Sequence, residues 1–215
     1  MSEQVLMPMI GTDSLENKER AQESLEKARL AHEKYLIGQR NNDLQEAIEH
    51  YVDAVKYDPT IPETYYRLAT LMWEQGQISV NTAIEQCKTA ISLAPLNKDA
   101  HLYTGYFMQL AQDFVSAEKE FKSAINMSRL NSGRPRMILS QSILQKINTQ
   151  NGTFKDYAGF LYYFLTGSIM LAWDRPTIKM FYKNISNDVS IFSYNTVGKF
   201  LEKFKDIIVI TCGIK

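Results

Sequence analysis

Apolar residues in the first two thirds of this chain recur at the three- and four-residue spacing that places them on one face of a helix. Residues 14–39 are rich in Glu, Lys, Ala, Leu and Arg, which are strong helix formers. The sequence DSLE at 13–16 predicts a helix start, because a capping residue is followed three positions later by glutamate. Residues 1–12 contain the helix breakers Pro8 and Gly11, and we expect them to form a disordered N-terminal segment.

Three copies of one spaced pattern follow. In each copy a small residue is followed four positions later by a larger one, and three positions after that by alanine. The copies are Ala47, Tyr51 and Ala54; Ala83, Cys87 and Ala90; and Ala117, Phe121 and Ala124. Small residues let two helices approach closely, and larger residues fill the gaps between them. Pro59 and Pro95 each follow the last alanine of a copy by five residues, where a proline ends the second helix of a pair.

The pattern resembles the tetratricopeptide-repeat (TPR) family, whose repeat is a helix–turn–helix of about 34 residues. Pro59 and Pro95 lie 36 residues apart, and Ala90 and Ala124 lie 34 residues apart. The resemblance implies an all-α fold, an α-solenoid (right-handed superhelix) of TPR helix–turn–helix pairs. It predicts three TPR repeats within residues 13–130.

The pattern weakens after residue 130, and we expect residues 131–215 to form degenerate helical repeats that complete the stack. The chain ends soon after the apolar, β-branched stretch 207–212. A solenoid normally finishes in a polar capping helix. This end is therefore compatible with a C-terminally truncated or fused chain.

The composition of the chain excludes several classes of function. Lys plus Arg equals 24 and Asp plus Glu equals 24 in 215 residues, and a net charge of zero argues against a nucleic-acid binder. The two cysteines, Cys87 and Cys212, are far apart and have no metal-ligand spacing, which predicts neither a metal site nor a disulfide framework. The first ten residues lack the features of a secretory signal peptide. We therefore expect a cytoplasmic protein.

The motifs of catalysis are missing from the sequence. It contains no phosphate-binding glycine loop, no H-E-x-x-H and no C-x-x-C. The three histidines are scattered over separate repeats, and Cys87 occupies the large-residue position of its repeat, where a buried hydrophobe is expected. The sequence thus predicts no enzyme, no cofactor and no bound metal.

In TPR proteins the concave groove is lined by the first helix of each pair, and the resemblance carries this role onto twelve positions. They are Arg29, His32, Leu36 and Gln39; Glu63, Tyr66, Thr70 and Trp73; and Asp99, Leu102, Tyr106 and Gln109. Tyr66, Trp73 and Tyr106 would form an aromatic stripe of partly exposed anchors for a protein segment. Packing of these aromatic residues against neighbouring repeats is an equally weighted alternative.

Some TPR proteins clamp the acidic C-terminus of heat-shock chaperones with Lys, Asn and Arg at set positions. The corresponding residues here are His32, Leu36, Arg67, Asp99 and Tyr103, and none of them is the type required at its own position. Asp99 would also repel a carboxylate. A helix or extended peptide with apolar anchors is therefore the expected partner.

An apolar segment near the C-terminus makes membrane association an alternative. Residues 157–173 contain no charged side chain, and tyrosine and tryptophan lie near the two ends of this segment. A span needs about twenty residues, so we favour a buried helix.

The sequence predicts a protein–protein interaction scaffold or adaptor. The alternatives are a membrane-associated assembly factor held by the apolar helix 154–173, and the TPR arm of a larger enzyme whose catalytic part is missing.

Overall fold

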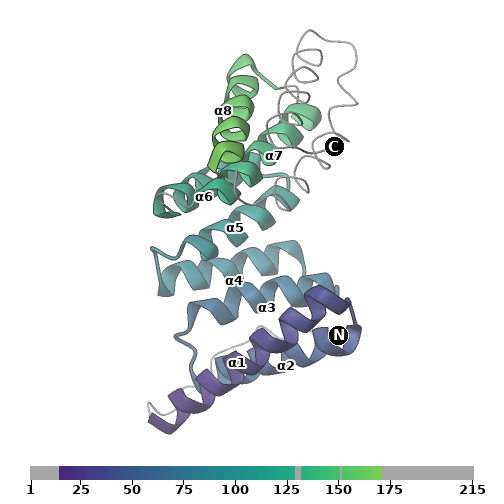
Figure 1. The fold of residues 1–215 in the computed structure, drawn as a ribbon, viewed down its shortest axis with the longest axis vertical. Coiled ribbons are helices and arrows are strands. Elements are labelled where there is room, and N and C mark those ends of the chain that lie inside the picture. The colour runs from purple at the N-terminus through teal and green to yellow at the C-terminus, as the bar shows by residue number, and fades with distance from the viewer. Residues whose placement is uncertain (1–14, 129–131, 151, 171–215) are drawn as a thin grey trace. The chain divides into compact units, whose positions relative to one another are not determined.

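A computed structural model describes residues 15–128, 132–150 and 152–170 of the chain. These residues form eight helices and no strand (Figure 1), which confirms the expected all-α class. The chain divides into two compact units, Met1–Asp113 and Phe114–Lys215. The expected disordered segment 1–12 and the expected repeats beyond residue 170 lie outside the described residues.

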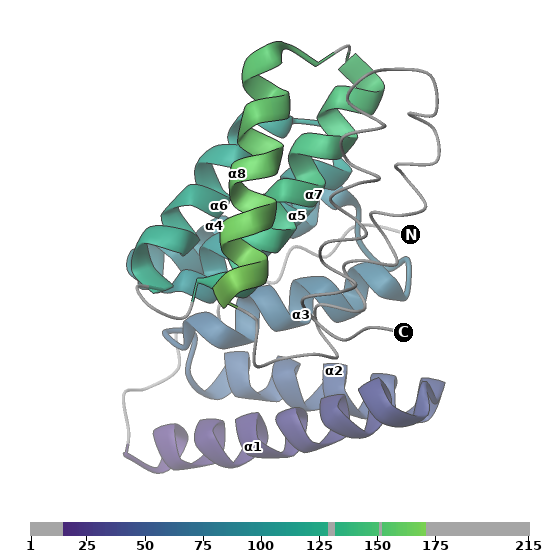
Figure 2. The same ribbon diagram turned by 45° about the horizontal axis from the view of Figure 1, so that its top comes forward.

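The first unit contains five helices that pack in sequence order. They are α1 (Leu15–Gly38), α2 (Asn41–Tyr57), α3 (Pro62–Glu74), α4 (Val80–Leu93) and α5 (Lys98–Leu110). Each helix contacts the next along the chain, and α3 also contacts α5. Figure 2 shows α1, α2 and α3 lying side by side. This is the helix–turn–helix stacking that the repeat pattern predicts.

Small residues make the close helix contacts, as the pattern predicts. One core cluster joins α1, α2 and α3 around Ala28, Ala47 and Tyr51. A second joins α3, α4 and α5 and contains Ala69, Ala83, Cys87, Ala100 and Phe107. These five side chains of the second cluster are all fully buried. The larger residues fill the space that the alanines leave between the helix axes.

The helices α3 and α5 end in the same way. Gly76 (φ 69°) and Gln112 (φ 62°) both adopt the left-handed conformation just after the helix. In each turn the next amide donates to a carbonyl five residues back, from Gln77 to Met72 (2.8 Å) and from Asp113 to Met108 (2.9 Å). This is a Schellman-type ending, which glycine adopts without strain. The two turns are 36 residues apart, so the structural repeat matches the sequence repeat.

The second unit contains α6 (Phe114–Ser128), α7 (Gly133–Gln150) and α8 (Phe154–Met170). The third expected pair, 98–128, thus has its first helix in one unit and its second helix in the other. Helix α8 begins with a capping box, because the Thr153 amide and hydroxyl both donate to Asp156 (2.8 and 2.6 Å). Lys146 of α7 pairs with Asp156 at 2.7 Å. Gly167 brings α8 so close to Met137 of α7 that an added Cβ would meet it at 3.0 Å.

Helix α8 is the apolar segment for which the sequence left a membrane role open. It has 17 residues up to Met170, and the expected continuation 171–173 lies outside the described residues. Phe160 and Phe164 are buried, whereas Tyr162 is 55% exposed. Over residues 15–128, 132–150 and 152–170, no helix combines the length and the apolar character that crossing a membrane requires.

Candidate protein-binding surface

The first helices of the pairs in the first unit, α1, α3 and α5, run in the same direction. Arg29 of α1 meets Glu63 in the first turn of α3, and Tyr35, further along α1, meets Glu74 in the last turn of α3. In α3 and α5, Tyr66 stacks on Tyr103. The side chains that these three helices present together are called the first-helix surface below.

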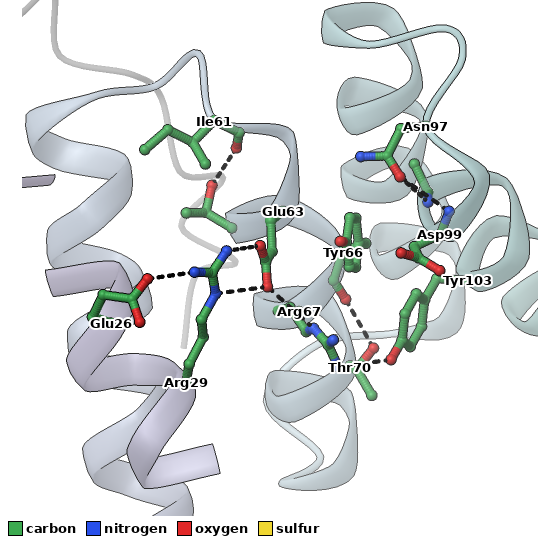
Figure 3. Close-up of polar contacts among 12 residues, drawn as sticks. Glu26, Arg29, Ile61, Glu63, Tyr66, Arg67, Thr70, Asn97, Asp99 and Tyr103 are labelled. Carbon is green, nitrogen blue, oxygen red and sulfur yellow. Dashed lines mark hydrogen bonds and ion pairs between the residues drawn. The ribbon is translucent and has the colours of Figure 1, made fainter. Parts of the chain in front are cut away.

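Glu63 lies at the centre of an ion-pair row at the start of this surface (Figure 3). The Arg29 guanidinium donates to both oxygens of Glu63, with Nε to Oε1 at 3.2 Å, and also pairs with Glu26. Arg67 Nε lies 3.7 Å from Glu63 Oε1, and its Nη1 donates to the Tyr103 hydroxyl at 3.0 Å. Hydrogen bonding to Glu63 raises the pKa of Arg29. The row connects α1, α3 and α5 through side chains about one repeat apart.

Two of the expected groove residues are part of the core instead. Tyr66 is only 4% exposed and stacks on Tyr103 with ring centroids 5.0 Å apart. His32 is 8% exposed, with its ring edge-on to Tyr51. Burial, together with the charge of Arg67, lowers the pKa of His32 to about 4, so this side chain is neutral at pH 7. The expected partial exposure of Tyr66 is therefore wrong.

Trp73 and Tyr106 form the exposed aromatic part of the surface. Their ring centroids are 6.2 Å apart in an edge-on arrangement, and both rings also contact the buried Phe107, at 5.8 and 5.5 Å. Tyr106 is 36% exposed and Trp73 is partly exposed. Leu110, one turn beyond Tyr106 on α5, is 38% exposed. The two partly exposed rings thus both pack against the buried ring of Phe107.

The remaining expected positions are distributed along the surface. Arg29, Leu36 and Gln39 are exposed; Glu63, Thr70, Asp99, Leu102 and Gln109 are partly buried. Thr70 donates to the carbonyl of Tyr66 within its own helix (2.8 Å). The Asp99 amide donates to Asn97, the N-cap of α5, at 3.0 Å. Tyr66 and His32 are thus buried, and the other ten of the twelve residues are exposed or partly buried.

Glu74 is a residue of this surface that the sequence reasoning missed. At about 100° per residue, Glu74 and Arg67 lie within roughly 40° of Glu63 around α3. Tyr66 and Trp73 lie about 60–80° from Glu63 to the other side, toward α5. The expected positions included the third residue after Glu63 and after Thr70, Tyr66 and Trp73, but not the fourth, Arg67 and Glu74, which lie at the surface. The charge of Glu74 beside the aromatic Trp73 was the available signal.

No group of three or more His, Cys, Asp or Glu side chains in the part of the chain that the structure describes could hold a metal ion. Cys87 is a free, buried thiol. Burial raises its pKa to about 12, and so keeps it protonated at pH 7. This position has the packing role that the sequence predicts.

Comparison with known proteins confirms the TPR resemblance. Residues 40–76, which span α2 and α3, match the family model of the TPR repeat. None of the curated proteins compared with the chain matches it.

Solved structures match the fold. A crystal structure of MamA protein matches with a TM-score of 0.57 and 16% identity, covering 90% of each chain. A mutant O-GlcNAc transferase from Thermobaculum terrenum matches with a TM-score of 0.58 and 16% identity, covering 72% of this chain but 27% of that one. Both likenesses are of the fold alone, a solenoid of TPR helix pairs.

Proposed function

Starting from this TPR fold, we propose that the chain is a non-catalytic protein-interaction scaffold that binds a peptide or helix segment on the first-helix surface. The observation that supports this most is the pair of partly exposed rings, Trp73 and Tyr106, side by side on α3 and α5. Aromatic side chains bury a large area at a small cost in conformational entropy, and they dominate interaction hot spots.

The ion-pair row supports the proposal by fixing the surface before a partner arrives. Arg29, Glu63 and Arg67 tie together the three helices that present the rings. A surface that is already ordered loses less conformational freedom on binding, so more of the contact energy appears as affinity. Solvent reaches these partly buried pairs, so each should contribute little to stability by itself.

The same row disfavours an acidic C-terminal tail as the ligand. Glu63 already pairs with both Arg29 and Arg67, which are the two arginines of this surface. A carboxylate ligand would have to displace Glu63 from them, and Asp99 stands close by. The proposed ligand is therefore a segment with apolar anchors.

A cytoplasmic setting remains part of the proposal. The buried, protonated thiol of Cys87 suits a reducing compartment, in which thiols stay unpaired. No observation specifically favours the arm of a larger enzyme, because the likeness to O-GlcNAc transferase is of fold only.

The proposal can be tested with peptides selected on the full chain. A random 12-residue peptide library is panned on the immobilised protein, and the affinities of the selected peptides are measured by calorimetry. Tyr106→Ala should cost about 2 kcal/mol of binding free energy, roughly thirtyfold in Kd, if this ring is an anchor. Tyr57→Ala on α2 is the matched control, because both tyrosines are 36% exposed.

Melting temperatures of the variants separate an anchor from a core residue. Tyr106→Ala should leave the melting temperature nearly unchanged. Trp73→Ala should lower it, because Trp73 also packs against the core cluster around Phe107. Equal affinities for wild type, Tyr106→Ala and Trp73→Ala would place the binding surface elsewhere on the chain.

A further inference from the structure

The C-terminal ends of α1, α3 and α5 lie together and carry no basic side chain. None of these three helices has a basic residue in its last turn. Residues 70–77 and 106–113, which include the two helix ends and the turns after them, contain neither Lys nor Arg. The helix dipole places partial negative charge at such ends, and three helices that run the same way add their effects.

Glu74 adds a full negative charge at this edge. Burial and the nearby charge of Glu74 raise the pKa values of Tyr35 on α1 and Tyr106 on α5. Partial burial raises the pKa of Glu74, while the bond from Tyr35 opposes that rise. Glu74 thus lies within electrostatic reach of Tyr35 on α1 and Tyr106 on α5, and it follows Trp73 in the last turn of α3.

No Lys or Arg in the described part of the chain forms an ion pair with Glu74. Arg40, beyond the end of α1, pairs with Asp43 at 2.8 Å. Lys34 is two positions from both His32 and Leu36, which places it on the opposite side of α1 from them. The situation contrasts with Glu63, whose carboxylate is shared by two arginines.

We propose that this edge, formed by Tyr35, Glu74, Trp73 and Tyr106, receives a Lys or Arg side chain of the bound segment. The partner is then a cationic peptide or helix in which an apolar residue beside the cation rests on Trp73 and Tyr106. A cation between aromatic rings and a carboxylate gains both cation–π and ion-pair attraction. The inference rests on the proposed function and names the chemistry of the ligand for the same surface.

The selected 12-residue peptides supply the probe. Those whose binding to the full chain depends on Tyr106 should be enriched in Lys or Arg next to an apolar residue. Glu74→Gln, which keeps the size and the acceptor for Tyr35, should weaken them about tenfold. Glu49→Gln is the matched control, because Glu49 on α2 likewise accepts a bond from a neutral donor, Gln45 at 2.9 Å. Raising the salt concentration should weaken binding to wild type more than to Glu74→Gln.

Charge reversal gives a second measurement that a loss of folding would not mimic. Glu74→Arg should lose the selected peptide and bind a peptide in which the critical Lys or Arg is replaced by Glu. Melting temperatures within a few degrees of wild type would show that Glu74→Gln and Glu74→Arg are folded.

The outcomes for the two proposals are distinct. Peptides that depend on Tyr106 but carry no cation, or that bind Glu74→Gln as tightly as wild type, would overturn the cationic ligand and leave the binding surface in place. Peptides that bind independently of Tyr106 and Trp73 would overturn the proposed function itself. A library that yields no binder would overturn both.

Discussion

Ala83 of α4 offers the most direct test of how the repeats fit together. Its side chain is fully buried in the cluster that joins α3, α4 and α5, beside Ala69 and Cys87. Replacing it by glutamate places a carboxylate on a methylene chain where two helices touch. Asn81→Glu is the matched control, since it adds the same side chain two positions away at an exposed site of the same helix.

The expected cost has two parts. A buried glutamate without a cationic partner has its pKa raised to about 8–9, from about 4.3 in the unfolded chain. At pH 7 the folded protein must therefore bind a proton, which costs about 3.5–4 kcal/mol of unfolding free energy. Forcing extra atoms into a packed core adds about 1–3 kcal/mol. The sum is comparable with the whole stability of an ordinary domain, about 5–15 kcal/mol. Ala83→Glu should therefore unfold the first unit or leave it marginal, whereas Asn81→Glu should change little.

Urea unfolding followed by circular dichroism measures the difference. Because the raised pKa belongs to the folded state, the penalty should shrink as the pH falls from 8 to 5, where the buried group can be protonated. Hydrogen exchange should show lost protection in α3 and α5 as well as in α4, since both neighbours pack against α4. A urea midpoint for Ala83→Glu equal to that of Asn81→Glu would mean that the repeat register is wrong.

Two further predictions concern titratable groups. Lys146 and Thr153 hold the pKa of Asp156 at about 2, below its ordinary value of 3.8, so its contribution is complete above pH 4 and is lost as the pH falls toward 2. Asp156→Asn should thus cost about 1–2 kcal/mol at pH 7, and its melting temperature should fall less than that of wild type between pH 5 and pH 2.5. In a Cys212→Ser background, Cys87 should react with a thiol reagent only at the rate of unfolding, because it is buried and its pKa is raised to about 12; rapid labelling of the folded protein would contradict the core packing described here.

The helix pairs could be predicted because their determinants are local. The alanines at 47, 83 and 117 repeat at nearly constant spacing, and all three are fully buried. Small residues at helix contacts recur in the sequence at a regular spacing, whichever residues they contact. The left-handed turn after α5 could not be predicted from a glycine, because Gln112 occupies the position that Gly76 has after α3.

The surface could be predicted only in outline, because a side chain's direction depends on small angles around the helix. One residue is about 100° of rotation, so Tyr66 and Arg67 face different neighbours although they are adjacent. Tyr66 turns toward α5 and stacks on Tyr103, and Arg67 remains at the surface beside Glu63. Whether Glu74 has a cationic partner depends on which residues of α1 lie opposite it, and this is set by tertiary packing.

The distribution of charge along α3 has a consequence for how a segment would lie on the surface. At the start of the helix, Glu63 is neutralised by Arg29 and Arg67, so a ligand there meets a surface whose charges are already paired. At the end of the helix, Glu74 lies near Tyr35 and Tyr106 and forms no ion pair with a Lys or Arg that the structure describes. A cationic residue at one end of a ligand is therefore attracted to only one end of the surface, and reversing the ligand would leave both charges unpaired. The ion pairs that link the three helices occupy Arg29 and Arg67, so the two ends of the surface differ in charge and a bound segment would have a preferred direction.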